Sequence, residues 1–401
     1  FNLKRKEFEK DNLIPNEIIK SDNIKENRLW KYGTKTWDKY FDKRQLLVLC
    51  TFAQNIKTIC SEIKDKDYQK VIATYLTFIL AKRVDMAGLG VLWHTRAEKP
   101  EHILTLRRPG IVYNFAESNP FEKIAGNFLN NVKSIKSGIL FATRLSNSSK
   151  CNLESVTLKT NKKYDLIITD PPYGDDIQYG ELSEFFYVWV INVLKNYFPE
   201  LPSRVNLDED FCVSKARFQN KSLALEFFEK GLKKSFVSMN DKLEDDGLLV
   251  VFFAHSSTEV WNLFLESIKE SKFRVISSYA MHTENASNVL TRGKTSFMSS
   301  IVVVCRKILE PSEAYFEDLT PQIEDKIKNM LKQIPDEKLL ALPITDLLIM
   351  VYGKVLEAST QHTELKSYTK DFTPDFETLI KDARSFIMKE LVGKITGKSL
   401  N

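Results

Sequence analysis

Residues 164–173 have the sequence YDLIITDPPY. Six residues rich in Ile and Leu are followed at once by Asp170 and by two prolines. A short apolar run that ends at turn-forming residues is typical of a buried strand that leads into a loop. Open α/β sheets bind their ligands at the carboxyl ends of such strands. The stretch therefore predicts a buried strand over 164–169 with a functional loop at its end.

The chain around this stretch alternates between helices and short apolar strands. Helical periodicity is expected over 128–136, 182–197, 223–243 and 257–271, and strands over 139–143, 164–169, 247–254, 273–279 and 299–305. Such alternation predicts an α/β fold with a parallel sheet and helices on both faces. The last two strands have no helix between them, so they are expected to pair as an antiparallel hairpin at the sheet edge.

The chain is expected to divide into three segments. Residues 1–127 are interpreted as a helical and loop-rich cap, with helices over 44–63 and 67–84 and an irregular stretch over 86–127. Residues 128–308 form the α/β core, and residues 309–401 form a C-terminal helical appendage whose helices are punctuated by prolines.

Composition narrows the class of protein. The chain has 401 residues and a net charge of +5, and residues 1–60 alone hold 13 Lys and Arg against 8 Asp and Glu. A basic segment of this kind suits contact with a polyanion such as nucleic acid, although an ordinary solvated helix surface would look the same. The sequence contains no apolar run long enough for a transmembrane helix. Five widely spaced cysteines without CxxC pairs favour unpaired thiols in the cytoplasm over a disulfide framework or a zinc site.

The loop after residue 169 has a defined chemistry. Pro171 and Pro172 restrict the backbone, and they donate no hydrogen bond. The Asp170 carboxylate and the Pro171 carbonyl are acceptors that can take both hydrogens of an amine. Tyr173 offers a flat ring on which a base can stack. An exocyclic amine inside a duplex is out of reach, so such a base would have to be flipped out. A plain polar turn is the structural alternative.

This arrangement resembles motif IV of the amino-methyltransferases. Residues 170–190, DPPYGDDIQYGELSEFFYVWV, are similar to the large adenine-specific DNA methylases, and so are segments 29–33, 115–121 and Ala254-His255 with Trp261. The resemblance implies a Rossmann-like methyltransferase sheet, with methyl transfer from S-adenosyl-L-methionine to the N6 amine of a flipped adenine in double-stranded DNA. It also implies that Asp170, Pro171, Pro172 and Tyr173 are catalytic, and that Asp170 contacts the cofactor.

One feature of that family is missing. Its members carry a Gly-rich cofactor loop after their first strand, and a loop of this kind lets the backbone approach a ligand closely. The only Gly-x-Gly in the chain is Gly88-Leu89-Gly90, which follows a helical pattern instead of an apolar strand. The resemblance therefore implies that the N-terminal part of the methyltransferase core is absent. An N-terminal half or a partner chain would supply the loop.

Further site residues are expected around this loop. Ala142 and Thr143, at the end of the expected strand 139–143, are placed by the resemblance near the adenine of the cofactor. His255 ends the strand 247–254 on the ligand side, where it could contact substrate or serve as a hydrogen-bonded structural residue.

The nucleic acid is expected to be contacted from two other segments. Glu117 and Asn119 are candidates to orient DNA or cofactor, and Arg292 and Lys294 are candidates for phosphate contacts. No metal site is expected, because His94 and His102 have no neighbouring cysteine ligand.

Two other functions remain open at this stage. DPPY followed by Gly also occurs in RNA methyltransferases that modify the N2 amine of guanine, and the chemistry at the amine is the same. The missing Gly-rich loop is equally compatible with a non-catalytic subunit that binds nucleic acid but no cofactor.

Overall fold

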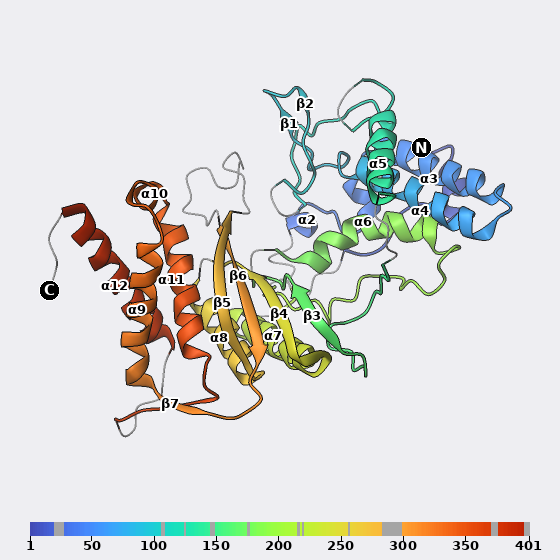
Figure 1. Ribbon diagram of the computed structural model, residues 1–401. Helices are drawn as coiled ribbons and strands as arrows, with labels where there is room; N and C mark the ends of the chain where they lie inside the picture. Colours follow the sequence, from blue (N-terminus) through green and yellow to red (C-terminus); the bar gives the residue numbers. More distant parts are fainter. Residues whose placement is uncertain are drawn as a thin grey trace. The chain divides into compact units, whose positions relative to one another are not determined.

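The computed structural model describes the chain from Phe1 to Thr396, apart from a set of short stretches (Figure 1). The residues not described are 20–27, 106–108, 124–125, 145–148, 175–176, 215–216, 219, 256, 283–298, 370–375 and 397–401. The chain forms two compact units. Unit 1 contains Phe1–Asn152, Ile177–Asp210 and Ser214–Ala224, and unit 2 contains Leu153–Asp176, Phe211–Val213 and Leu225–Asn401.

Unit 1 is largely helical. Its elements are α1 (Arg5–Lys10), α2 (Arg28–Lys31), η1 (Trp37–Tyr40), α3 (Lys43–Ser61), α4 (Lys66–Val84), β1 (Trp93–His94), β2 (Lys99–Pro100), α5 (Phe128–Ala142) and α6 (Tyr179–Leu194). The two helices predicted over 44–63 and 67–84 are confirmed as α3 and α4. Each begins at an aspartate cap: Asp42 accepts a hydrogen bond from the Arg44 amide, and Asp65 accepts one from the Tyr68 amide.

The core of unit 1 is aromatic and joins distant segments. Helix α4 packs against α3, α5 and α6. The Phe185 ring of α6 lies 5.8 Å from the Phe41 ring in a stacked arrangement, and the Trp189 ring lies 5.3 Å from Phe41. All three side chains are buried. The helix that follows the DPPY loop therefore groups with the N-terminal helices, so the two observed units divide the chain differently from the three expected segments.

Unit 2 is built on a mixed sheet of four strands. The strands are β3 (Tyr164–Thr169), β4 (Leu243–Phe253), β5 (Phe273–His282) and β6 (Ser299–Lys307), in the order β3-β4-β6-β5. Strands β3 and β4 are parallel, whereas β6 is antiparallel to both β4 and β5. The α/β class and the antiparallel hairpin of the last two strands are therefore confirmed.

Helices cover one face of this sheet. The Phe264 ring of α8 (Thr258–Glu270) stacks on Phe253 of β4 at 4.1 Å, and Phe236 of α7 (Lys221–Lys242) contacts Phe264 at 5.8 Å. Both helices lie behind the strands in Figure 1. Helix α11 (Ile344–Ser359) approaches the same face at Ile301. Helices on both faces were expected, but α7, α8 and α11 share one face within the described part of unit 2.

The C-terminal part of unit 2 is helical as expected and also contains two short strands. It consists of β7 (Glu313–Tyr315), η2 (Phe316–Asp318), α9 (Leu319–Lys332), α10 (Asp336–Ala341), α11, β8 (Glu364–Lys366) and α12 (Phe376–Thr396). Strands β7 and β8 pair in parallel, and α9 and α12 pack on α11. Nowhere in the described residues is there a helix with the length and apolar character needed to cross a membrane.

Two expectations about local structure were wrong. Residues 139–143 are the last turn of α5 and not a strand, because the helix that Asn127 caps continues through Gly138. A short apolar run such as ILFA cannot be assigned to strand or helix by its pattern alone. Strand β3 exists as predicted but is not buried: Leu166 is 49% exposed and Ile168 is 63% exposed.

Candidate functional site

The DPPY loop begins where β3 ends, as the sequence predicts. Asp170 is exposed, whereas the next residue, Pro171, is buried. The Tyr173 hydroxyl donates a hydrogen bond to Asp170 Oδ1. The Tyr173 ring is therefore fixed across the carboxylate, with one of the two carboxylate oxygens engaged inside the loop.

The Tyr173 ring packs against the buried core of the sheet. Its ring meets the ring of Phe253 edge to face, at 5.8 Å and 87°. Phe253 is the last residue of β4 and is fully buried between the sheet and α8. Because β3 and β4 are parallel, their carboxyl ends lie at the same edge of the sheet. The neighbouring strand thus holds the tyrosine ring in place.

A glycine turn brings His255 to the same place. Gly174 has a φ of +93°, which favours glycine, and its amide plane is held by a 2.9 Å hydrogen bond from the Val213 amide to the Gly174 carbonyl. A Cβ at Gly174 would lie 3.5 Å from His255 Nε2. Asp170, Tyr173 and His255, which the sequence placed at two strand ends, are therefore brought together in unit 2.

The orientation of the His255 ring is defined by its other nitrogen. The Ser257 amide donates to His255 Nδ1 at 2.9 Å, and Trp261 Nε1 donates to the His255 carbonyl at 2.9 Å. Since Nδ1 accepts a hydrogen bond, the neutral ring carries its hydrogen on Nε2. That N–H lies next to Gly174 of the DPPY loop. The site therefore offers an acceptor at Asp170 and a donor at His255.

The other predicted site residues do not join this cluster within unit 2. Glu117 is in unit 1, where its Oε2 forms a 2.8 Å ion pair with Arg44. Asn119 accepts a hydrogen bond from the Phe121 amide at 3.1 Å and shapes the local turn. Both residues have structural partners within unit 1. Arg292 and Lys294 lie outside the described residues.

Ala142 and Thr143 lie at the C-terminal end of α5 in unit 1, and not at a strand end. The Thr143 hydroxyl donates to the Leu140 carbonyl at 3.0 Å, as is common for a residue that ends a helix. The reason for assigning these two residues to a cofactor site was the expected strand 139–143, and that strand is not formed.

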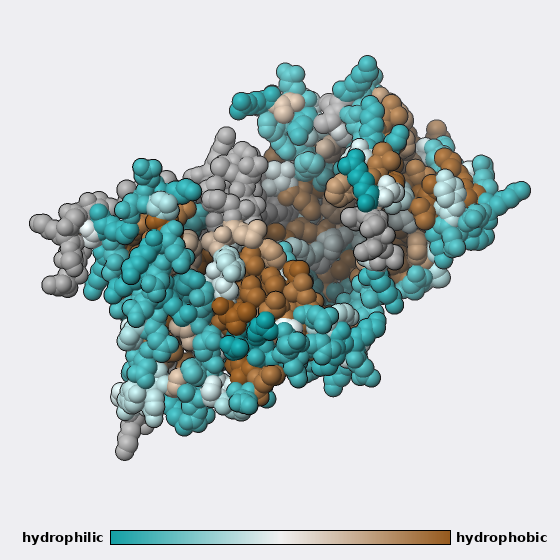
Figure 2. All heavy atoms as spheres, viewed as in Figure 1, coloured by the Kyte–Doolittle hydropathy of each residue, from teal (hydrophilic) through white to brown (hydrophobic). Residues whose placement is uncertain are grey.

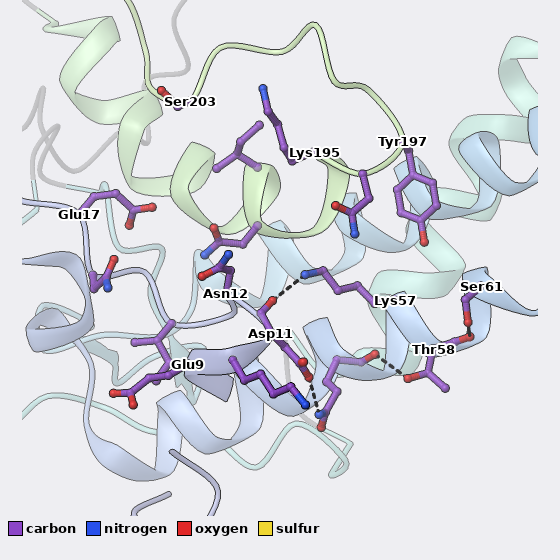
Figure 3. A pocket seen from close by; sticks show the side chains of 17 residues that line it. Glu9, Asp11, Asn12, Glu17, Lys57, Thr58, Ser61, Lys195, Tyr197 and Ser203 are labelled. Carbon is purple, nitrogen blue, oxygen red and sulfur yellow. Dashed lines mark hydrogen bonds between the residues drawn. The ribbon is translucent and has the colours of Figure 1, made fainter. Parts of the chain in front are cut away.

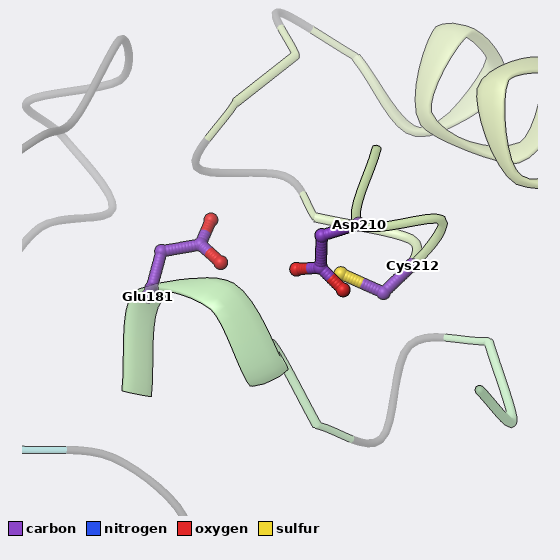
Figure 4. Close-up of side chains that lie close together, drawn as sticks. All are labelled: Glu181, Asp210 and Cys212. Atoms are coloured by element: carbon purple, nitrogen blue, oxygen red, sulfur yellow. The ribbon is translucent and has the colours of Figure 1, made fainter. Parts of the chain in front are cut away.

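Sequence analysis missed an ion-pair cluster in unit 1. The Arg217 guanidinium pairs with Glu181 at 2.6 Å and also with Asp210, and it donates to the Leu207 and Asp210 carbonyls. Figure 4 shows the Glu181 and Asp210 carboxylates facing each other. The single guanidinium forms ion pairs with both carboxylates, so Arg217, Glu181 and Asp210 form a structural cluster. The partners are 29 and 36 residues from Glu181 in the chain, and no local pattern could have indicated them.

Unit 1 also contains a polar cavity of about 830 Å³ between the N-terminal segment, α3 and the end of α6 (Figure 3). Lys57 Nζ donates to the Asp11 carbonyl at 2.8 Å, and burial lowers the pKa of Lys57. Burial also raises the pKa of Glu17, whose Oε2 has no hydrogen-bond partner among the described residues. Charged and amide groups dominate the wall, whereas pockets for cofactors are mostly apolar.

The Gly88-Leu89-Gly90 segment is packed and not open. A Cβ at Gly88 would lie 2.9 Å from the Tyr40 ring, and one at Gly90 would lie 2.2 Å from the Gly110 carbonyl oxygen. These glycines therefore allow close packing inside unit 1 and form no cradle for a ligand.

Comparison with known proteins returned no match: no family model, no curated protein and no solved structure resembles the chain at a significant level.

Proposed function

We propose that the chain holds the target base of a methyltransferase that modifies the N6 amine of a flipped adenine in double-stranded DNA, with S-adenosyl-L-methionine as donor. The observation that carries the proposal is the meeting of Asp170, Tyr173 and His255 at the carboxyl ends of two parallel strands. In this proposal the mixed sheet of unit 2 is part of a Rossmann-like methyltransferase sheet. The chain is also proposed to work in the cytoplasm, since none of its five cysteines forms a disulfide.

The chemistry of the loop follows from its acceptors. The Asp170 carboxylate and the Pro171 carbonyl each accept a hydrogen bond from one N–H group of the adenine amine. An amine held in this way directs its lone pair away from the two acceptors. The Tyr173 ring, fixed by Asp170 and Phe253, is an ordered surface for the base. In this proposal His255 Nε2, which lies beside Gly174 of the loop, donates a hydrogen bond to a ring nitrogen of the same base.

The described residues do not fit the donor. The Gly88–Gly90 segment is filled by Tyr40 and Gly110, and the large cavity of unit 1 has a charged wall. We therefore assign to this chain the binding and orientation of the base, and no step that involves the donor.

The proposal is tested by methylation in the presence and absence of the polypeptide encoded immediately upstream. Double-stranded DNA, transfer RNA and methyl-labelled donor are incubated with the chain, and the nucleosides are analysed by mass spectrometry. Formation of N6-methyladenine in DNA is expected. Asp170→Ala should lower the rate about 100-fold, since one lost charged hydrogen bond costs roughly 1.5–3 kcal/mol.

The matched control is Asp165→Ala, because Asp165 is an exposed carboxylate on the same strand. Its rate should stay within about twofold of the parent rate, in line with surface substitutions of roughly 0.5 kcal/mol. Unchanged methylation by Asp170→Ala would refute the assignment. N2-methylguanine in RNA would support the RNA enzyme, and DNA binding without methylation would support a non-catalytic subunit.

A further inference from the structure

A second cavity of unit 1 has a positively charged wall. Its volume is about 310 Å³, and it is lined by the first turns of α3, by the end of α4 and by residues 117–120. The charged side chains of the wall are Arg44, Arg83 and Glu117, so positive charge is in excess. A cavity of this volume lies at the lower end of the range for small-molecule sites. Its wall differs from the visible face of the unit 2 sheet, where apolar residues gather over β4 and β6 (Figure 2).

Arg83 is the buried charge of this wall. It is only 6% exposed, and its Nη1 and Nη2 donate to the hydroxyl and the carbonyl of Ser118 at 3.0 and 2.7 Å. Its Nε is buried and has no hydrogen-bond partner among the described residues. Burial lowers the pKa of Arg83, and the attraction of Glu117 offsets this effect only in part. A buried guanidinium without a bound anion is costly, so an anion in the cavity would stabilise it.

Gln45 adds a second unused donor to the same wall. It is 4% exposed, and its Oε1 accepts hydrogen bonds from the Asp42 amide at 3.0 Å and from the Gly88 amide at 3.2 Å. Because two backbone N–H groups donate to this atom, it is the oxygen, and the other atom is the amide nitrogen. That nitrogen has no hydrogen-bond partner among the described residues. A glutamate would also complete the capping box of α3, so the glutamine supplies a donor that the cap does not need.

We propose that this cavity binds a small oxyanion, a phosphate or carboxylate group, with the Arg83 guanidinium and the Gln45 amide as its donors. Hydrogen bonds from a guanidinium to such groups are among the strongest in proteins. Neither nitrogen is open to solvent, so we expect both side chains to turn toward the cavity when the anion enters. The site lies within unit 1, and the inference goes beyond the proposed function and does not depend on it.

Glu117 is the competing anion within the chain. Its carboxylate lies in the same wall and attracts Arg83, although its ion pair is with Arg44. If Glu117 were the anion that Arg83 requires, its removal would bring no gain in binding of an added anion. If the cavity takes an external anion, removal of Glu117 should strengthen binding, because a like charge is lost.

The test is a titration of the intact chain with inorganic phosphate, with sodium chloride keeping the ionic strength constant. The NMR signals of the Arg83 Nε–H and Gln45 Nε2–H groups are followed, and saturable shifts of both are expected. Gln45→Glu keeps the helix cap but replaces the donor by a negative charge, so it should weaken binding at least about tenfold. Glu117→Gln should strengthen binding roughly two- to fivefold.

The matched control is Asn55→Asp, which also replaces an amide by a carboxylate on α3. Asn55 is exposed and lies outside the cavity, about 15 Å further along the helix. Its affinity for phosphate should stay within about twofold of that of the parent chain. Unfolding midpoints of the variants show that each is folded. The inference is overturned by the absence of shifts, by equal binding of the parent chain and Gln45→Glu, or by weaker binding of Glu117→Gln.

Two further titrations identify the source of the oxyanion. If a short DNA duplex shifts the two signals and phosphate displaces it, the oxyanion is a phosphate of nucleic acid. If phosphate or sodium acetate shifts them but the duplex does not, the ligand is a small molecule. None of these titrations contains a methyl donor, so a failure of anion binding and a failure of methyl transfer are observed separately.

Discussion

Replacing Gly353 by alanine should destabilise unit 2, although alanine is the better helix former. Gly353 lies inside α11, where it touches the sheet: a Cβ there would be 2.4 Å from Ser278 Oγ and 2.7 Å from Ile301 Cδ1. Ser278 also donates a hydrogen bond to Glu357 of the same helix, and Glu357 pairs with Lys354 at 2.6 Å. The new methyl group must therefore displace the helix or break this small network.

The magnitude follows from two opposed effects. Alanine in place of glycine in a helix interior gains roughly 0.5–1 kcal/mol. Overpacking a filled contact costs roughly 1–3 kcal/mol. The net loss at Gly353 should be about 1–2 kcal/mol. Gly138, inside α5, has no atom within 4 Å of its Cβ position, so Gly138→Ala should show only the gain.

The assay is guanidinium unfolding followed by tryptophan fluorescence and by amide exchange of α11. Trp261, whose ring lies 5.4 Å from Tyr352, is the tryptophan of unit 2 and reports on this contact. The midpoint of unit 2 should fall by a few tenths of a molar, taking roughly 4 kcal/mol per molar as the slope. An unchanged or higher midpoint for Gly353→Ala would show that α11 is not pressed against β5 and β6.

Three further outcomes can be measured directly. Arg217→Gln should destabilise unit 1 by about 2 kcal/mol, because Glu181 and Asp210 lose the cation that they share, and the Arg217 side chain is only 9% exposed. Amide exchange around residues 207–217 should become faster, and unchanged exchange would contradict this prediction. Burial raises the pKa of Glu17 in the native state, so at a pH where the free carboxyl group is ionised the native state loses stability. Glu17→Gln removes this cost and should raise the unfolding midpoint at pH 7 but not at pH 4. An equal effect at both pH values would refute the reasoning. Cys151 is exposed, the other four cysteines are buried, and burial raises the pKa of Cys50 to about 12. Ellman's reagent should therefore react quickly with one thiol in the native protein and with five thiols after denaturation.

The elements that sequence analysis predicted well are those whose signal is local. Helices α3 and α4 have apolar periodicity and an aspartate cap, and β4 contains a continuous apolar run, which is typical of a buried strand. The parallel pairing of β3 and β4 also predicted that Asp170 and His255 would share one edge of the sheet. These inferences required no knowledge of distant contacts.

What escaped prediction depends on partners far along the chain. The placement of α6 in unit 1 rests on the stacking of Phe185 with Phe41, which are 144 residues apart. Glu117 was expected to orient DNA or cofactor, because the sequence does not reveal that its ion-pair partner is Arg44, which is 73 residues away. The exposure of β3 escaped for a related reason: its sequence has the pattern of an interior strand, and nothing local reveals which neighbours are present.

The exposure of β3 bears directly on the candidate site, because Asp170 is the residue that follows its last strand residue. A strand held on one side only opens more easily than one inside a sheet, since local opening is governed by the hydrogen bonds and apolar contacts that must be given up. Tyr173 and Phe253 hold the loop from the β4 side, but no described strand holds it from the other side. Residues 164–169 should therefore open more readily than β4, which is paired with β3 on one side and with β6 on the other. Amide exchange of the two strands checks this, and equal exchange rates would contradict the reasoning.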